Sequence, residues 1–195
     1  MDDRYSPPER LLIWAIPGLP EVAQGARLAE LVANALAAQN LPVADRDVLV
    51  VAQKIVSKSE GRMVELARVT PSEYAKSVGE TYGKDPRQVE VILRESRRIV
   101  RMDAGVIVVE THHGLVCANA GVDASNVPEG WVSLLPADPD VTAGHLRDGI
   151  AERTGKKVAV IITDTFGRPW REGLTNVAIG VAGFSPLLDY RGQKD

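Results

Sequence analysis

The chain has 195 residues, of which 45% are hydrophobic and 25% are charged, and its formal net charge is −3. This is the composition of a globular protein long enough to bury a sizeable core, and it offers no broad basic field for nucleic acid or an anionic membrane. The single cysteine, Cys117, excludes an intramolecular disulfide, the start Met1-Asp2-Asp3 lacks the features of a signal peptide, and no apolar run is long enough to span a bilayer.

Apolar runs bounded by turn residues predict strands at residues 11–16, 48–52, 63–66, 105–111, 131–135, 158–162 and 175–182. Helical periodicity and capping residues predict helices at residues 26–38, 71–82, 86–99 and 138–155. Asp85-Pro86 and Asp138-Pro139 each supply an N-cap and a first-turn proline, and Gly155 ends the last helix. Because strands and helices alternate irregularly, we expect one domain over residues 1–195 with an α+β or mixed α/β fold.

Two polar stretches follow buried strands and are interpreted as one site. Residues 117–126 come after the strand at 105–111 and a turn at residues 112–114, and residues 163–171 come directly after the strand at 158–162. Open α/β sheets place their sites at the carboxyl ends of strands. The alanines and the glycine of the first stretch allow a ligand to approach the backbone closely.

Asp123 and Asp164 are candidate ligands for Mg²⁺ or Mn²⁺, with the Thr165 or Ser125 hydroxyl as a further oxygen donor. The alternative is that Asp123 caps a turn and Asp164 caps a helix, which aspartates often do. Both interpretations remain open, because the spacing matches no stereotyped calcium or zinc motif.

Lys54 and Lys58 follow the strand at 48–52, where their ammonium groups would meet phosphates as point charges. A solvated turn is the alternative. A Walker-type phosphate loop is not expected, because the nearest look-alike, Gly155-Lys156, follows a helix and precedes a strand, the reverse of that motif.

Other polar residues give weaker signals. Arg168 and Arg171 would pair with a carboxylate or phosphate, or else lie in a surface loop. The arginines at 94, 97, 98 and 101 are expected on a solvated helix face. The histidines and the cysteine are expected to be structural, with His112 and His113 unable to chelate one ion as a pair, His145 on a helix surface, and Cys117 buried without a catalytic base.

Residues 47–62, 113–126 and 162–171 resemble the coenzyme F420-0:L-glutamate ligase family, also called F420 gamma-glutamyl ligases. The similarity runs from about Pro17 to the last residue, and the combination of motifs is highly specific. The resemblance implies a cytoplasmic homodimer with mixed sheets flanked by helices. It also implies GTP as co-substrate, Mn²⁺ or Mg²⁺ as the metal, and K⁺ as a helper.

The reaction implied by the resemblance adds L-glutamate to coenzyme F420-0 and then extends the tail through γ-linkages. The residues that match the family's metal ligands are Asp123, Asp164 and Thr165. The resemblance implies Asp123, Asp164 and Lys58 as the catalytic residues. GTP contacts match at Leu19, Pro20, Glu21, Val22, Gln53, Lys54, Lys58 and Asn126.

The sequence departs from the family pattern at three places. Ala26-Arg27 stands where an acidic pair is usual, Asn176 stands where an aspartate is usual, and members continue well beyond the Tyr-Arg-Gly segment that closes this chain. The family's C-terminal segment is therefore expected to be missing. Two rivals to a ligase remain: a non-catalytic nucleotide- or F420-binding remnant, and a metal-dependent phosphohydrolase.

Overall fold

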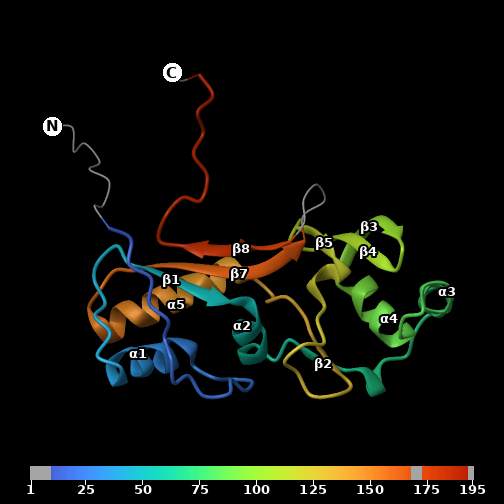
Figure 1. Cartoon of the computed structure of the whole chain (residues 1–195), viewed down its shortest axis with the longest axis horizontal. Coiled ribbons are helices and arrows are strands. Elements are labelled where there is room, and N and C mark those ends of the chain that lie inside the picture. Colours follow the sequence, from blue (N-terminus) through green and yellow to red (C-terminus); the bar gives the residue numbers. More distant parts are fainter. Residues whose placement is uncertain (1–9, 168–172, 193–195) are drawn as a thin grey trace.

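The computed structural model describes residues 10–167 and 173–192, which form two lobes side by side (Figure 1). The first lobe contains α1 (Leu28–Ala38), α5 (Pro139–Thr154), β1 (Val48–Ala52), β7 (Ala159–Gly167) and β8 (Leu174–Ala182). The second lobe contains α3 (Glu73–Tyr82), α4 (Pro86–Arg94), β3 (Ser96–Asp103), β4 (Val106–Thr111) and β5 (Val116–Ala118). Between them lie α2 (Gln53–Ser59), β2 (Met63–Glu65) and β6 (Trp131–Ser133). The short 3₁₀ turns η1 (Leu66–Arg68) and η2 (Asn119–Gly121) add Leu66 and Ala120 to the core of the second lobe.

Each lobe has its own sheet. In the first, β1 pairs in parallel with β7, and β7 pairs antiparallel with β8, which gives the order β1-β7-β8. In the second, β3, β4 and β5 form an antiparallel sheet, while β2 and β6 pair separately between the lobes. This mixture of parallel and antiparallel strands with helices confirms the expected α+β class.

The first lobe is held together by apolar side chains from α1, α5, β1 and β7. Ile150 of α5 and Ile162 of β7 are 1% and 0% exposed, and burial of such a side chain contributes about 1.5–3 kcal/mol. The predicted caps of α5 are confirmed, since the Asp138 side chain accepts a hydrogen bond from the Val141 N–H at 3.0 Å and Gly155 ends the helix with φ of 68°.

The second lobe has a separate core beneath its sheet. Val89 and Ile92 of α4 pack with Ile107 and Val109 of β4, and all four are fully buried. Because the two cores are separate, polar contacts as well as packing hold the lobes together at their junction.

Two predicted elements are wrong. Residues 11–16 form no strand, and Leu11 and Ile13 are 83% and 86% exposed, because this segment pairs with no strand of the described chain. The helix predicted at residues 86–99 ends at Arg94, and Ser96–Asp103 pairs with β4 instead. Ladder hydrogen bonds and the β-branched pair Ile99-Val100 outweigh helical periodicity here.

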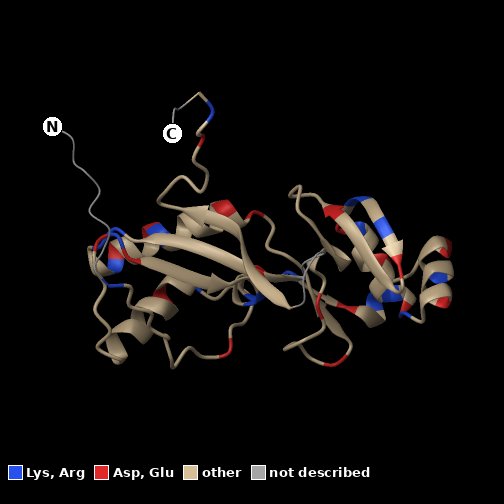
Figure 2. Cartoon of the chain, turned by 45° about the horizontal axis from the view of Figure 1, so that its top comes forward, with Lys and Arg blue, Asp and Glu red and all other residues tan. Residues whose placement is uncertain are grey.

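Because α4 ends at Arg94, the arginines expected on one helix face lie on two different elements. Arg94 remains on α4 and pairs with Glu90, whereas Arg97 and Arg98 lie on β3 and both pair with Glu110. Positive and negative residues interleave over both lobes (Figure 2). Within the part of the chain that the structure describes, no helix is both long and apolar enough to cross a bilayer.

Two glycines of α5 provide a matched test of the helix packing. A Cβ at Gly149 would lie 2.6 Å from the Ala29 Cβ on α1, whereas a Cβ at Gly144 meets nothing within 4 Å. Gly144→Ala should therefore stabilise the protein by up to about 1 kcal/mol through helix propensity. Gly149→Ala should instead destabilise it by about 1–3 kcal/mol, because α1 and α5 must separate. Urea unfolding of both variants measures the difference, and equal stabilities would contradict the close α1–α5 packing.

Candidate active site

The parallel pairing of β1 and β7 brings two predicted segments to one sheet edge. Val51 and Ala52 of β1 lie opposite Ile162 and Thr163 of β7, so α2, which begins at residue 53, leaves β1 next to Asp164, the following residue of β7. The Lys54 segment is therefore helical rather than the alternative solvated turn. Asp164 lies inside β7, which extends to Gly167, so the alternative of a helix cap is wrong for this residue.

The loop at residues 117–126 carries Asp123 to this edge from the second lobe. Asn119, Ala120 and Gly121 all have positive φ, at 52°, 55° and 69°, a conformation that costs non-glycine residues energy and is common at functional sites. Beyond this turn the Asp123 backbone pairs with Ser133, with its N–H donating at 3.0 Å and its carbonyl accepting at 2.8 Å. The backbone of Asp123 is thus anchored, and its carboxylate caps the following turn by accepting the Ser125 N–H, as the alternative interpretation expected.

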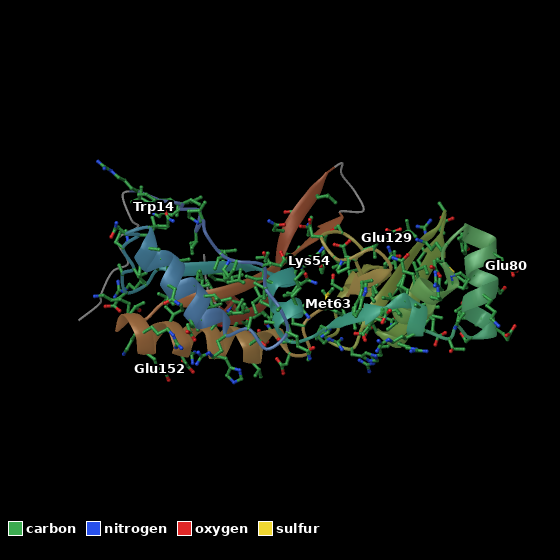
Figure 3. The ribbon with its side chains drawn as sticks, turned by 90° about the horizontal axis from the view of Figure 1, so that it is seen from below. Trp14, Lys54, Met63, Glu80, Glu129 and Glu152 are labelled. Carbon is green, nitrogen blue, oxygen red and sulfur yellow. The ribbon has the colours of Figure 1, made fainter. Side chains whose placement is uncertain are left out.

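The Lys54 ammonium joins the two segments. It donates to the Asp123 Oδ2, to the Ser125 carbonyl at 2.6 Å and to the Ser125 Oγ at 2.7 Å. Ser125 completes the cluster, because its N–H and its hydroxyl donate to the two Asp123 carboxylate oxygens at 2.8 and 2.6 Å. Figure 3 shows Lys54 at the junction of the two lobes.

The two carboxylates have opposite pKa shifts. Burial raises the pKa of Asp164, and the nearby charge of Asp123 raises it further, against the opposing charge of Lys54. Burial also acts to raise the pKa of Asp123, but hydrogen bonds from Lys54 and Ser125 outweigh it and hold that pKa below its ordinary value. The pair therefore shares one electrostatic environment, with Asp123 as the more firmly ionised member.

Cys117 lies next to this pair and is buried, as predicted. Burial raises the pKa of its thiol to about 11, and the charge of Asp164 contributes to the rise. Because a thiolate is the nucleophile of cysteine chemistry, such a thiol is inert near neutral pH.

Thr165 sits beside Asp164 in β7 and pairs across the hairpin with Asn176 of β8. The Thr165 hydroxyl donates to the Asn176 Oδ1 at 2.8 Å. The residue that departs from the family pattern thus contacts a predicted metal ligand directly.

The predicted segment at residues 19–22 lies beside α2. Lys58 of α2 forms an ion pair with Glu21, and the Gly25 N–H donates to the Ser59 carbonyl at 2.8 Å. Val22 is buried in the first core, while the Lys58 side chain retains only 15% exposure. The structure therefore places Lys58 beside Glu21 of this segment.

The remaining predicted residues are more scattered. Gln53 is 4% exposed and its amide donates to the Leu134 carbonyl at 3.3 Å, so its side chain lies against the second lobe. Asn126 is exposed with a φ of 53°. Arg168 and Arg171 fall outside the described residues.

The histidines have the structural places expected of them. His112 and His113 occupy the predicted turn, where their Nε2 atoms lie 2.9 and 2.8 Å from the carbonyls of Arg94 and Pro136 respectively. They face different partners and form no chelating pair. His145 is exposed on α5.

The donors fit a hard divalent cation. The carboxylates of Asp123 and Asp164 offer oxygen ligands, while the Thr165 hydroxyl is hydrogen-bonded to Asn176. Mg²⁺ commonly uses one or two carboxylates together with substrate phosphates and water. Over residues 10–167 and 173–192, no three His, Cys, Asp or Glu side chains gather as a closed metal cage.

Comparison with known proteins agrees with the motifs. The F420-0:Gamma-glutamyl ligase family matches over residues 18–195. The Coenzyme F420:L-glutamate ligase of Methanothermobacter thermautotrophicus is 47% identical over 180 residues, which cover 92% of this chain and 71% of the relative. The enzyme of the same name from Methanopyrus kandleri is 48% identical over 185 residues, covering 95% and 71%, and that of Archaeoglobus fulgidus is 42% identical over 186 residues, covering 95% and 72%.

A family match over most of the chain, together with this level of identity, decides the assignment: the chain belongs to the F420-0:gamma-glutamyl ligase family.

Proposed function

We propose that this protein is an amide-bond-forming ligase that adds L-glutamate to coenzyme F420-0, extends the tail through γ-linkages and consumes GTP. Family membership supports the ligase activity, and the relatives' name, Coenzyme F420:L-glutamate ligase, supports the substrates. The observation that carries the proposal is the convergence of Lys54, Asp123 and Asp164 from three separate segments at one edge of the first sheet.

The chemistry requires an activated acid. A carboxylate resists attack by an amine because oxide is a poor leaving group. In the proposed reaction, a carboxylate oxygen of F420-0 attacks the γ-phosphorus of GTP, GDP leaves, and an acyl phosphate forms. The glutamate amine then attacks the carbonyl carbon and loses a proton, and inorganic phosphate departs with the original carboxylate oxygen.

The residues of the site suit phosphoryl transfer. Asp123, Asp164 and Thr165 would hold Mn²⁺ or Mg²⁺, and the bound ion supplies neutralisation of charge on the transferring phosphoryl group. Lys58 provides fixed positive charge to the nucleotide, with Glu21 as its partner before GTP arrives. Asn126, Gln53 and residues 19–22 are proposed to complete the GTP site.

Mass spectrometry tests the proposal. The protein is incubated with F420-0, GTP, Mn²⁺ and L-glutamate, and the cofactor is weighed. A gain of one or more glutamyl units is expected. Phosphate release without that gain would indicate a phosphohydrolase, and retained ligand binding without either reaction would indicate a binding remnant.

The family resemblance further supports a cytoplasmic homodimer that uses K⁺ as a helper ion. Light scattering of the folded protein at micromolar concentration should give the mass of a dimer. A monomer mass under those conditions would contradict this part of the proposal.

A further inference from the structure

Lys54 occupies the position of a cation at the proposed metal site. All three N–H donors of its ammonium group contact oxygens of Asp123 and Ser125, namely a carboxylate, a carbonyl and a hydroxyl. Oxygens of these types are the ligands that Mg²⁺ and Mn²⁺ prefer. The ammonium group is therefore bound by the donor set that a hard metal ion would use.

The same ammonium group also acts on the second carboxylate. Asp164 experiences the negative charge of Asp123 and the positive charge of Lys54 together. Two neighbouring carboxylates repel each other unless a cation offsets them. Lys54 supplies that charge in the metal-free protein.

Lys54 is held in place rather than free at the surface. It lies in the first turn of α2, directly after β1, and its side chain is only 18% exposed. Lys58, one turn further along the same helix, instead contacts Glu21. The two lysines of α2 thus have different partners, and only Lys54 contacts a proposed metal ligand.

We propose that Lys54 is a resident cation that exchanges with the divalent metal, which must displace the ammonium group from Asp123 to bind. This inference rests on the metal site of the proposed function and adds a coupling to it. Before the metal binds, Asp123 holds Lys54. After the exchange, the released ammonium group is available to a nucleotide phosphate, so metal loading makes this phosphate contact possible.

The exchange is tested by measuring the Mn²⁺ affinity of the protein by calorimetric titration in the absence of nucleotide. Lys54→Met keeps the length of the stem and removes the competing charge, so Mn²⁺ should bind about 10- to 100-fold more tightly than to wild type. Lys58→Met removes a charge from the same helix but not from Asp123, and its Mn²⁺ affinity should stay within about threefold of wild type, well below the tenfold step of ~1.4 kcal/mol. Asp164→Asn should bind Mn²⁺ weakly.

A spectroscopic measurement separates exchange from simple charge repulsion. In ¹⁵N-labelled protein, the side-chain signal that is missing in Lys54→Met is assigned to Lys54. Saturation with the diamagnetic ion Mg²⁺ should shift that signal toward the position of a solvated ammonium group. An unchanged Lys54 signal in Mg²⁺-saturated protein would overturn the exchange.

The outcomes for the exchange and for the metal site differ. Equal Mn²⁺ affinities of wild type and Lys54→Met, with loss of binding in Asp164→Asn, would overturn the exchange and leave the metal site standing. Unimpaired Mn²⁺ binding by Asp164→Asn would show that the metal is bound elsewhere, which removes the basis of both.

Discussion

Asp164→Asn should abolish nearly all glutamate ligation and most of the stabilisation that Mn²⁺ gives the fold. The substitution keeps the size of the side chain and removes a carboxylate that would hold the metal next to Asp123. A ligand that binds only the folded state raises the melting temperature. Loss of a ligand therefore reduces both the thermal shift and the activity.

The metal-free variant should remain folded at neutral pH and be at least as stable as wild type. The pKa of Asp164 is raised by burial and by Asp123, so ionisation of this carboxyl group costs more free energy in the folded protein than in the unfolded chain. A carboxyl group of this kind contributes stability below its unfolded pKa, and that contribution is lost as pH rises through the folded pKa. Asparagine stays neutral, so this loss should be absent from the variant.

Melting curves with and without Mn²⁺, recorded at several pH values, measure both effects. Asp103→Asn is a suitable control, since Asp103 is an exposed residue of β3 paired with Arg101, and it should keep the wild-type Mn²⁺ shift. Equal Mn²⁺ shifts in wild type and Asp164→Asn would refute the metal assignment.

Lys58→Ala should weaken GTP binding by about 1–3 kcal/mol, the range for loss of a charge-assisted hydrogen bond. The lysine has a largely buried stem and pairs with the exposed Glu21, so a phosphate would replace a solvent-accessible carboxylate as its partner. Lys76→Ala on α3 removes a lysine that pairs with Glu73 and should leave GTP affinity unchanged. Calorimetry of the three proteins compares them, and an unchanged affinity for Lys58→Ala would place this side chain outside the nucleotide site.

Local sequence signals predicted the elements that depend on local interactions. The helix α5 follows directly from Asp138, Pro139 and Gly155, which cap its ends. The signals failed where distant pairing decided the outcome. Residues 96–99 continue the helical pattern of α4, but hydrogen bonds to β4 make them part of strand β3. Residues 11–16 look like a strand but have no partner within the described chain.

In the candidate site, too, local sequence signals identified residues, whereas contacts between distant segments were not predictable. The residue types and their places after strands predicted Asp123, Asp164 and the lysines of α2. The contact between Lys54 and Asp123 spans 69 residues of sequence and depends on the β1–β7 register and on the loop at residues 119–121. No local pattern contains that information, which is why the pairing of the ammonium group with a proposed metal ligand emerged only from the structure.

An isotope-transfer measurement tests the proposed ligation most directly. F420-0 labelled with ¹⁸O in its reacting carboxylate is incubated with the protein, GTP, Mn²⁺ and L-glutamate, and the inorganic phosphate is analysed by mass spectrometry. One ¹⁸O should appear in the phosphate for each amide bond formed, because the acyl phosphate carries a carboxylate oxygen to phosphorus. Phosphate without ¹⁸O, whose fourth oxygen then comes from water, would contradict the acyl phosphate and indicate hydrolysis of GTP instead.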